Sequence, residues 1–279
     1  LEFSIPDLGC STFSAQTEDG DQIFGRNFDL TYSPALFVET EPENGYRSLS
    51  TVNLAFLGFG EDKLPETFKE KIITLAAPYA PLDGINEKGL TVAVLRIGDE
   101  PTNQDTGKVD ITTTTAIRLM LDKAADVEEA LALLEQYDMH SSAGSCYHFQ
   151  ISDARGKSVV VEYVDNEYEV IPAKNNYQMV TNFLLSDKKY NFGSGQDRYE
   201  ILKNTLDECK GVLKDEQAAM DLLKAASSDW HVSETTGRLN ATQWSIIYNN
   251  TDLTASVITG RQYDKPAHEF SLVGEIREE

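Results

Sequence analysis

The chain has 279 residues, with 46 acidic and 24 basic side chains, and its formal net charge is −22. A protein that binds nucleic acid needs basic side chains to replace the counterions of the phosphates, so this charge argues against nucleic acid as a partner. It also disfavours an anionic membrane surface. With 41% apolar residues the chain is globular. Its apolar runs, such as 72–80, are far shorter than the roughly 18–20 residues of a membrane span.

Cysteine and histidine are too few and too scattered to build a metal centre. The three cysteines are Cys10, Cys146 and Cys209, and the four histidines, His140, His148, His231 and His268, are scattered as well. No spacing typical of a zinc site or a disulfide framework occurs. The sequence therefore predicts no metal and no cofactor, and it leaves at least one thiol free.

In chain order, the first third is predicted to form strands. The expected strands are 11–16, 22–28, 36–39, 51–57, 72–75 and 90–95. The first two flank Asp19 and Gly20, and an Asp-Gly pair between short apolar runs is typical of a hairpin. A turn centred there pairs residues whose numbers sum to about 39, which would place Cys10 beside Asp29.

The rest of the chain predicts pairs of helices between further strands. Helices are expected at 112–122, 127–136 (capped by Asp126), 196–206 and 216–226, and strands at 148–153, 158–164, 168–171, 178–181, 242–248, 254–259 and 269–273. This order does not alternate strand and helix strictly, so it favours an α+β protein with helices packed on antiparallel sheets. No linker or repeat divides the chain, and we expect one domain.

The residues that indicate chemistry lie at the two ends of the first hairpin. A thiol nucleophile needs a stabilised thiolate and a nearby base. Arg26 is expected to lower the pKa of the Cys10 thiol, and Asp29 to hold a protonated amine. The plainer alternatives are a buried apolar cysteine and a surface ion pair of little energetic value.

Several blocks, in order along the chain, resemble the choloylglycine hydrolase family of linear-amide C–N hydrolases. This family includes bile salt hydrolases, penicillin V acylases and, more distantly, acid ceramidase. The blocks are residues 10–12, 25–29, the DGINEKGL segment at 83–90, 148–153, 156–162, 180–182, Arg198 and the TQW segment at 242–244.

The resemblance implies an N-terminal nucleophile hydrolase with a four-layer αββα sandwich. The nucleophile of such an enzyme is the first residue of the mature chain, and its own α-amine is the general base. Residues 1–9 are then a propeptide or leader remnant, and 10–279 form the single catalytic domain. We expect autocatalytic cleavage between Gly9 and Cys10. The absence of an initiator Met favours a bacterial secreted or cell-envelope protein over a cytoplasmic one.

The resemblance also implies a role for each matching residue. Cys10 attacks the amide carbonyl and forms a thioester, while Arg26 stabilises the thiolate and Asp29 orients the freed amine. Asn182 donates its side-chain amide to the oxyanion, a contribution of roughly 3–4 kcal/mol for similar donors. Arg198 positions the constellation or holds a substrate anion.

Two features depart from the family pattern. Arg96 stands ten residues after Asn86, where relatives carry Asn or Tyr beside the oxyanion. It is expected to supply a charged donor to the oxyanion or to bind an acidic group of the substrate, and the plainer alternative is a strand-end arginine that faces solvent. Only 15 residues separate Asn182 from Arg198. Bile salt hydrolases have a longer excursion there that helps build their tetramer, so any homo-oligomer would lack that assembly loop.

The acyl pocket is expected around 32–36 and 56–68, with Phe59 and Leu64 among its apolar lining. The substrate class is a small N-acyl amide whose acyl group and amine stay open. Alternatives within this class are a bile salt hydrolase or penicillin V acylase proper, or an acyltransferase that uses the same residues.

Two readings from other classes compete with this one. A papain-like enzyme would use Cys146 and His148, which face the same side of a strand, but a papain-type cysteine opens a helix. A non-catalytic binding protein on the same fold is the stronger rival, since fold does not fix function.

Overall fold

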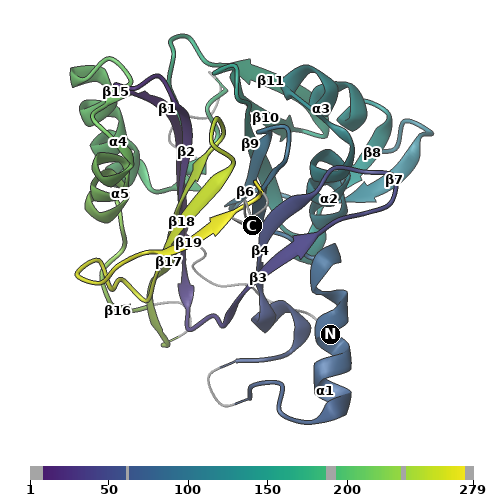
Figure 1. Cartoon of the computed structure of the whole chain (residues 1–279). Helices are drawn as coiled ribbons and strands as arrows, with labels where there is room; N and C mark the ends of the chain where they lie inside the picture. The colour runs from purple at the N-terminus through teal and green to yellow at the C-terminus, as the bar shows by residue number, and fades with distance from the viewer. Residues whose placement is uncertain (1–8, 61–62, 187–192, 234–236, 274–279) are drawn as a thin grey trace, which may run out of the picture.

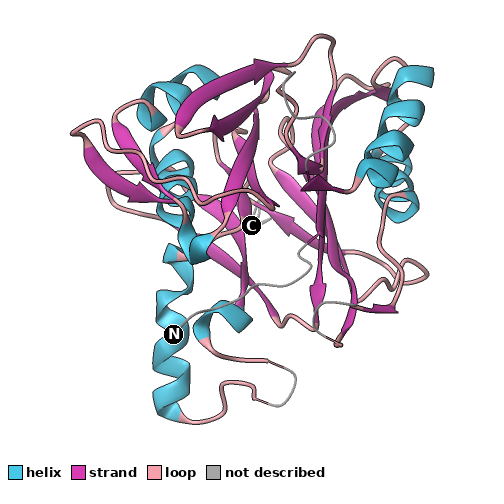
Figure 2. Ribbon diagram, turned by 180° about the vertical axis from the view of Figure 1, so that it is seen from behind, coloured by secondary structure: helices cyan, strands magenta, loops and turns pink. Residues whose placement is uncertain are grey.

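Two large β-sheets lie face to face, and a pair of helices covers the outer face of each (Figures 1 and 2). The computed structural model describes residues 9–60, 63–186, 193–233 and 237–273. This is the αββα sandwich expected from the sequence. None of the helices in these four ranges is long and apolar enough to cross a membrane.

The first sheet carries the nucleophile hairpin at its centre. Its order is β12-β1-β2-β17-β18-β19, with β15 beside β1 and β16 beside β17. The strands are β1 (Gly9–Thr17), β2 (Gln22–Thr31), β12 (Gln178–Val180), β15 (Val212–Leu213), β16 (His231–Val232), β17 (Leu239–Asn249), β18 (Thr254–Thr259) and β19 (His268–Ser271). The hairpin thus has neighbours on both sides, which fixes its ends firmly.

The second sheet has the order β11-β10-β9-β6-β5-β4-β3. Its strands are β3 (Ala35–Thr40), β4 (Ser48–Asn53), β5 (Asp83–Asn86), β6 (Thr91–Ile97), β9 (Cys146–Ser152), β10 (Ser158–Val164) and β11 (Glu167–Pro172). Two small pairs accompany it: β7 (Val109–Thr112) with β8 (Tyr137–His140), and β13 (Asn182–Phe183) with β14 (Gly193–Ser194).

The predicted helices form on the outer faces. Helices α4 (Gln196–Glu208) and α5 (Glu216–Ala225) pack on the first sheet, and α2 (Thr113–Lys123) and α3 (Val127–Leu134) pack on the second. Asp126 caps α3 as expected, because its side chain accepts a hydrogen bond from the Glu129 amide. One apolar core lies between the sheets and a second between the first sheet and α4 and α5.

The segment 68–79 differs from the prediction. The expected strand at 72–75 is helical: it belongs to α1 (Phe68–Ile73) and the 3₁₀ helix η2 (Thr74–Tyr79). Thr67 and Glu70 form a capping box that starts α1, and this local signal outweighs the β-branched residues that suggested a strand. The expected strand 51–57 also ends early, at Asn53, where the 3₁₀ helix η1 (Leu54–Leu57) begins.

Candidate active site

The register of the first hairpin decides which side chains lie near the nucleophile. Cys10 pairs with Phe28 and Gly9 pairs with Asp29, so partners sum to 38 rather than the expected 39. A slip of one residue turns a side chain to the other face of the sheet. The prediction that places Cys10 beside Asp29 in the ladder is therefore wrong, because Cys10 shares its face with Arg26 and Phe28. This face packs against the second sheet.

Arg26 is the cation nearest the thiol. Its Nη2 lies 3.7 Å from Cys10 Sγ, and Nη1 donates to the Val94 carbonyl at 2.8 Å. Its Nε is 2.8 Å from Asp83 Oδ2, and both side chains are fully buried. Tyr248 donates to the other Asp83 oxygen at 2.5 Å. The second sheet therefore supplies a buried counter-charge that holds Arg26 against the nucleophile.

The pKa of the Cys10 thiol differs from the expectation while Gly9 remains attached. This pKa is raised to about 11, because burial, the largest cause, together with the charge of Asp29 outweighs the lowering by Arg26. Arg26 does act in the predicted direction, but its charge is outweighed by the loss of water around the sulfur. In this form the thiol is neutral at neutral pH.

The backbone of Cys10 is held by two residues from distant segments. Its N–H donates to Asn182 Oδ1 at 2.7 Å, and its carbonyl accepts from Arg198 Nη1 at 2.6 Å. Arg198 also donates from Nη2 to Asn182 Oδ1 at 2.8 Å, and Asn182 Nδ2 donates to the Arg96 carbonyl at 2.8 Å. Asn182 and Arg198 thus hold the two peptide groups that flank the Cys10 Cα atom.

Asp29 lies on the opposite face of the hairpin, beneath Gly9. Its Oδ2 is 3.1 Å from Arg198 Nη1, and its Oδ1 accepts from the Thr242 hydroxyl at 2.6 Å. A Cβ atom on Gly9 would come within 2.8 Å of Asp29 Oδ2. Glycine is therefore required directly before the cysteine because the carboxylate occupies the space of a side chain.

A β-bulge in β17 places neighbouring side chains of this strand on both faces of the hairpin. The register shifts between Thr242, which pairs with Asp29, and Trp244, which pairs with Phe28. Thr242 consequently supports the carboxylate, while Trp244 stacks on Phe28 with ring centroids 4.1 Å apart. Such bulges commonly re-aim side chains beside active sites.

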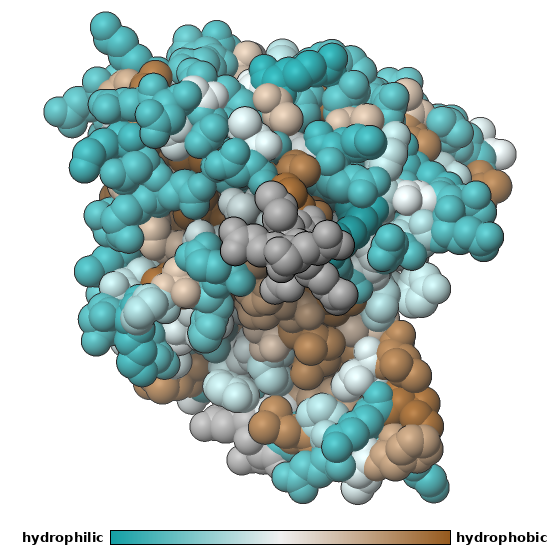
Figure 3. All heavy atoms as spheres, viewed as in Figure 1, coloured by the Kyte–Doolittle hydropathy of each residue, from teal (hydrophilic) through white to brown (hydrophobic). Residues whose placement is uncertain are grey.

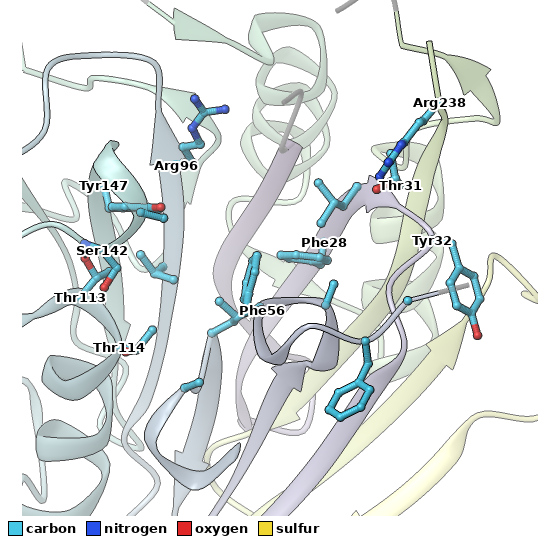
Figure 4. Close-up of a pocket in the computed structure, with 18 of the residues that line it drawn as sticks. Phe28, Thr31, Tyr32, Phe56, Arg96, Thr113, Thr114, Ser142, Tyr147 and Arg238 are labelled. Atoms are coloured by element: carbon cyan, nitrogen blue, oxygen red, sulfur yellow. Dashed lines mark hydrogen bonds between the residues drawn. The ribbon is translucent and has the colours of Figure 1, made fainter. Parts of the chain in front are cut away.

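A cavity of about 1020 Å³ opens beside this cluster (Figure 4). Arg26 and Phe28, the neighbours of Cys10, form part of its wall, together with apolar side chains from both sheets and the intervening segments. Those apolar residues include Leu30, Phe56, Phe59, Leu82 and Val94. The expected acyl pocket around 32–36 and 56–68 therefore matches the observed cavity in part. Leu64 is 47% exposed and is not among the lining residues.

The charge of the cavity wall is opposite to that of the whole protein. Its charged lining residues are Arg26, Lys63, Arg96 and Arg238, and no Asp or Glu belongs to the described wall. The Nε of Arg96 donates to the Ser145 hydroxyl at 2.8 Å, and Arg96 has no carboxylate partner among the described residues. Arg96 is half-buried rather than fully solvent-facing. Figure 4 places Arg96 and Arg238 on opposite sides of the cavity.

Exposed apolar side chains gather near this opening. Tyr32, Phe56, Trp230 and Leu239 line the cavity and are 37–53% exposed. Figure 3 shows further apolar surface over α1 at the same end of the molecule. The mouth of the cavity is therefore suited to an amphiphilic ligand.

Sequence reasoning missed two members of the buried cluster, Asp83 and Tyr248. Asp83 is the first residue of the DGINEKGL motif at 83–90, which was interpreted as a turn. In the structure it is the first residue of β5, and its side chain is fully buried. An acidic residue at the start of an apolar strand is a signal that a buried cation lies opposite, because such charges are almost never buried unpaired. The rival pair Cys146 and His148 does not form a dyad, because the ring nitrogens of His148 contact Glu162 and Thr181 instead.

The fold and this site define a class of protein. A cysteine near the start of a central strand, inside an αββα sandwich, is the arrangement of the N-terminal nucleophile hydrolases. A solved cysteine-to-alanine mutant of the conjugated bile acid hydrolase of Clostridium perfringens superimposes with a TM-score of 0.67 at 17% identity, covering 94% of this chain and 92% of that chain. Penicillin V acylase of Agrobacterium tumefaciens gives 0.65 at 16% identity, covering 95% and 87%.

The family follows from sequence. Residues 10–185, well over half of the chain, match the model of the linear amide C–N hydrolases, choloylglycine hydrolase family. The chain belongs to this family, which confirms the resemblance seen in the motifs.

Two curated relatives match over shorter stretches. A bile salt hydrolase/transferase of Clostridium perfringens is 29% identical over 188 residues, which is 62% of this chain and 53% of that protein. A penicillin V acylase of Pectobacterium atrosepticum is 30% identical over 127 residues, 42% of this chain and 34% of that protein. The match thus spans about half of one relative and a third of the other.

Proposed function

We propose that this protein is a cysteine N-terminal nucleophile amidohydrolase that cleaves a linear N-acyl amide through a thioester at Cys10. One observation carries the proposal. Both backbone groups of Cys10 and its sulfur are contacted by polar side chains from separate segments: Asn182, Arg198 and Arg26. A merely structural buried cysteine would need no such partners.

The first step is removal of residues 1–9. The Cys10 sulfur attacks the Gly9 carbonyl carbon, the C–N bond to Cys10 breaks, and a thioester joins Gly9 to the sulfur. The nitrogen takes up the thiol proton and leaves as the α-amine. Water then hydrolyses the thioester, which frees the Gly9 carboxylate and the thiol. The close approach of Gly9 to Asp29 supports this site of cleavage, because it leaves a carboxylate next to the residue whose peptide bond breaks.

The same atoms then act on substrate. The free α-amine takes the thiol proton, and the sulfur attacks the amide carbonyl. The amine returns the proton to the leaving nitrogen, and the C–N bond breaks to leave an acyl thioester. Water, deprotonated by the amine, releases the acid and regenerates the thiol. Asp29 holds the ammonium form, and Arg26 with its partner Asp83 stabilises the thiolate.

Asn182 is proposed to stabilise the oxyanion. One N–H of its side chain already donates to the Arg96 carbonyl, and the amide carries a second N–H. Its oxygen is fixed by Arg198, so the amide is preorganised before substrate arrives. Preorganised donors of this kind contribute most when they need not reorient during the reaction.

The cavity supports a substrate with an apolar acyl group and an acidic group. Many of its lining side chains are aromatic or aliphatic, and Arg96, which has no carboxylate partner among the described residues, remains for an anion. Arg96, a proposed substrate-binding residue, has a guanidinium fork suited to a carboxylate. Phe59 would contact the acyl chain, whereas Leu64 is not among the residues of the described wall. A bile salt hydrolase or penicillin V acylase proper, or acyl transfer to a second amine, would use the same residues.

The test uses the chain beginning at Leu1, with Cys10→Ala as its matched control. We expect hydrolysis of at least one member of a panel of penicillin V, a glycine-conjugated bile salt, an N-acyl homoserine lactone and a long-chain N-acyl glycine. The Cys10→Ala chain should be inactive. Binding of these compounds without hydrolysis, equal in both chains, would instead establish a binding protein.

A further inference from the structure

A buried His–Glu pair lies behind the segment that carries Asn182. His148 on β9 and Glu162 on β10 are both fully buried, and His148 Nδ1 is 3.2 Å from Glu162 Oε1. His148 Nε2 is 2.7 Å from the Thr181 carbonyl oxygen. Neither residue touches Cys10, and neither has a role in the chemistry described above.

The partners determine where the protons lie. A carbonyl oxygen only accepts, so His148 Nε2 must carry a hydrogen and donate it to Thr181. One further proton then lies between Nδ1 and the Glu162 carboxyl. Glu162 also accepts the amide hydrogens of Leu185 at 2.7 Å and Ser186 at 3.2 Å. All of these side-chain and backbone groups are thereby paired inside the protein, as buried polar groups must be.

These hydrogen bonds hold the backbone on both sides of Asn182. His148 holds the residue before it, and Glu162 holds the third and fourth residues after it. The local backbone supplies little support of its own, because β13 has two residues and, within the described ranges, pairs only with the two residues of β14. The position of the Asn182 amide therefore depends on two buried side chains of the second sheet.

We infer that His148 and Glu162 form a positioning pair that fixes the Asn182 amide for transition-state stabilisation. This inference rests on the proposed function, since it assigns a purpose to Asn182. A shift of about 1 Å in a catalytic group can cost about 100-fold in rate. Loss of the pair is therefore expected to lower kcat and to leave KM nearly unchanged.

The test compares two substitutions at one position. His148→Leu removes both hydrogen bonds, whereas His148→Gln keeps an amide N–H that reaches toward the Thr181 carbonyl. With penicillin V or whichever panel amide the wild type hydrolyses, we expect kcat of His148→Leu to fall about 100-fold with KM within about twofold. His148→Gln should recover most of the loss.

A matched control separates positioning from simple destabilisation. Val161→Ala makes a cavity in the same strand as Glu162, on the alternate face of β10, and should lower the melting temperature without lowering kcat. Hydrogen exchange gives a readout that needs no substrate. The Leu185 and Ser186 amides should exchange at least about tenfold faster in His148→Leu, and other strands of the second sheet should be unchanged.

The outcomes are distinct. Wild-type exchange at 185 and 186 in His148→Leu, or a kcat equal to that of wild type, would overturn the positioning pair. A kcat loss in Val161→Ala as large as in His148→Leu would also overturn it. If the wild type hydrolyses no amide on the panel, the proposed function fails. The exchange measurement still decides whether His148 and Glu162 hold the backbone of residues 181–186.

Discussion

The surroundings of Cys10 and the cavity next to them are built in different ways. Around Cys10, each charged side chain has a partner of opposite charge: Arg26 pairs with Asp83, and Arg198 pairs with Asp29. In the cavity, the Arg96 guanidinium has the Ser145 hydroxyl as its only side-chain hydrogen-bond partner among the described residues. The charges around Cys10 are therefore balanced within the protein, whereas the Arg96 guanidinium in the cavity is available to an anionic group of a ligand.

This difference indicates that the residues around Cys10 determine the reaction, whereas the cavity wall determines which substrate binds. Arg26, Asp29 and Asp83 come from strands of the two packed sheets, whose register allows little freedom, and the short strand β13 and helix α4 add Asn182 and Arg198. Much of the cavity wall comes from strand ends and from connecting segments such as 55–60, 142–143 and Trp230, which can vary without disturbing the core. Substitutions in the first region should therefore affect stability and rate, and substitutions in the second should affect substrate binding.

The largest expected effect concerns the thiol before and after cleavage. With Gly9 attached, the pKa of Cys10 is raised to about 11, so its thiolate fraction should rise tenfold per pH unit from pH 7 to 10. After cleavage the new α-ammonium lies beside the sulfur and favours the thiolate. Iodoacetamide should therefore label the peptide that starts at Cys10 far faster than the peptide that contains Gly9–Cys10. Both forms can be followed by mass spectrometry in one sample, and equal labelling rates would contradict this account.

Next in size is the loss of the buried counter-charge. Asp83→Asn keeps the shape of the side chain but leaves the Arg26 guanidinium without an anion. Breaking such a pair typically costs about 3–5 kcal/mol, measured as the free energy of unfolding in urea. Asp110→Asn is the control, because Asp110 is 67% exposed and its pairing with His140 should contribute less than about 1 kcal/mol. Equal stability of the two variants would show that Asp83 is not the anchor of Arg26.

A smaller effect is expected from Gly195, directly before α4. Its φ is +85°, and a Cβ atom there would lie 2.5 Å from Arg198 Nη2. Gly195→Ala should cost about 1 kcal/mol for the left-handed backbone and should also displace Arg198 from Cys10. Gly107→Ala is the matched control, with φ +86° and no atom within 4 Å of the added Cβ. Both variants should lose similar stability, but only Gly195→Ala should lose activity.

The smallest expected effect lies in the cavity. Arg96→Gln should raise KM for an acidic N-acyl amide about tenfold, the loss of roughly one charged hydrogen bond, with little change in kcat. A neutral amide with the same acyl group should show no such rise. If KM for both amides changes equally, Arg96 does not bind the substrate anion.

The sequence predicted the strands and helices around the site well, and the reasons for the failures are specific. Motif order located Cys10, Arg26, Asn182 and Arg198, because those residues are tied to short local patterns. The hairpin register was wrong by one residue, since a two-residue turn signal does not fix how the flanking strands pair. The expected role of Arg96 anticipated part of the cationic wall, but Lys63 and Arg238 were not expected there, because they come from segments that are distant along the chain.

The most direct test of the central claim is the intact mass of the chain beginning at Leu1, measured over time at neutral pH. The account predicts that wild type loses the mass of residues 1–9 and starts at Cys10, whereas Cys10→Ala keeps its full length. A wild-type chain that retains Gly9 and yet hydrolyses an N-acyl amide would contradict the account, because the α-amine of Cys10 would not then be free to serve as the base.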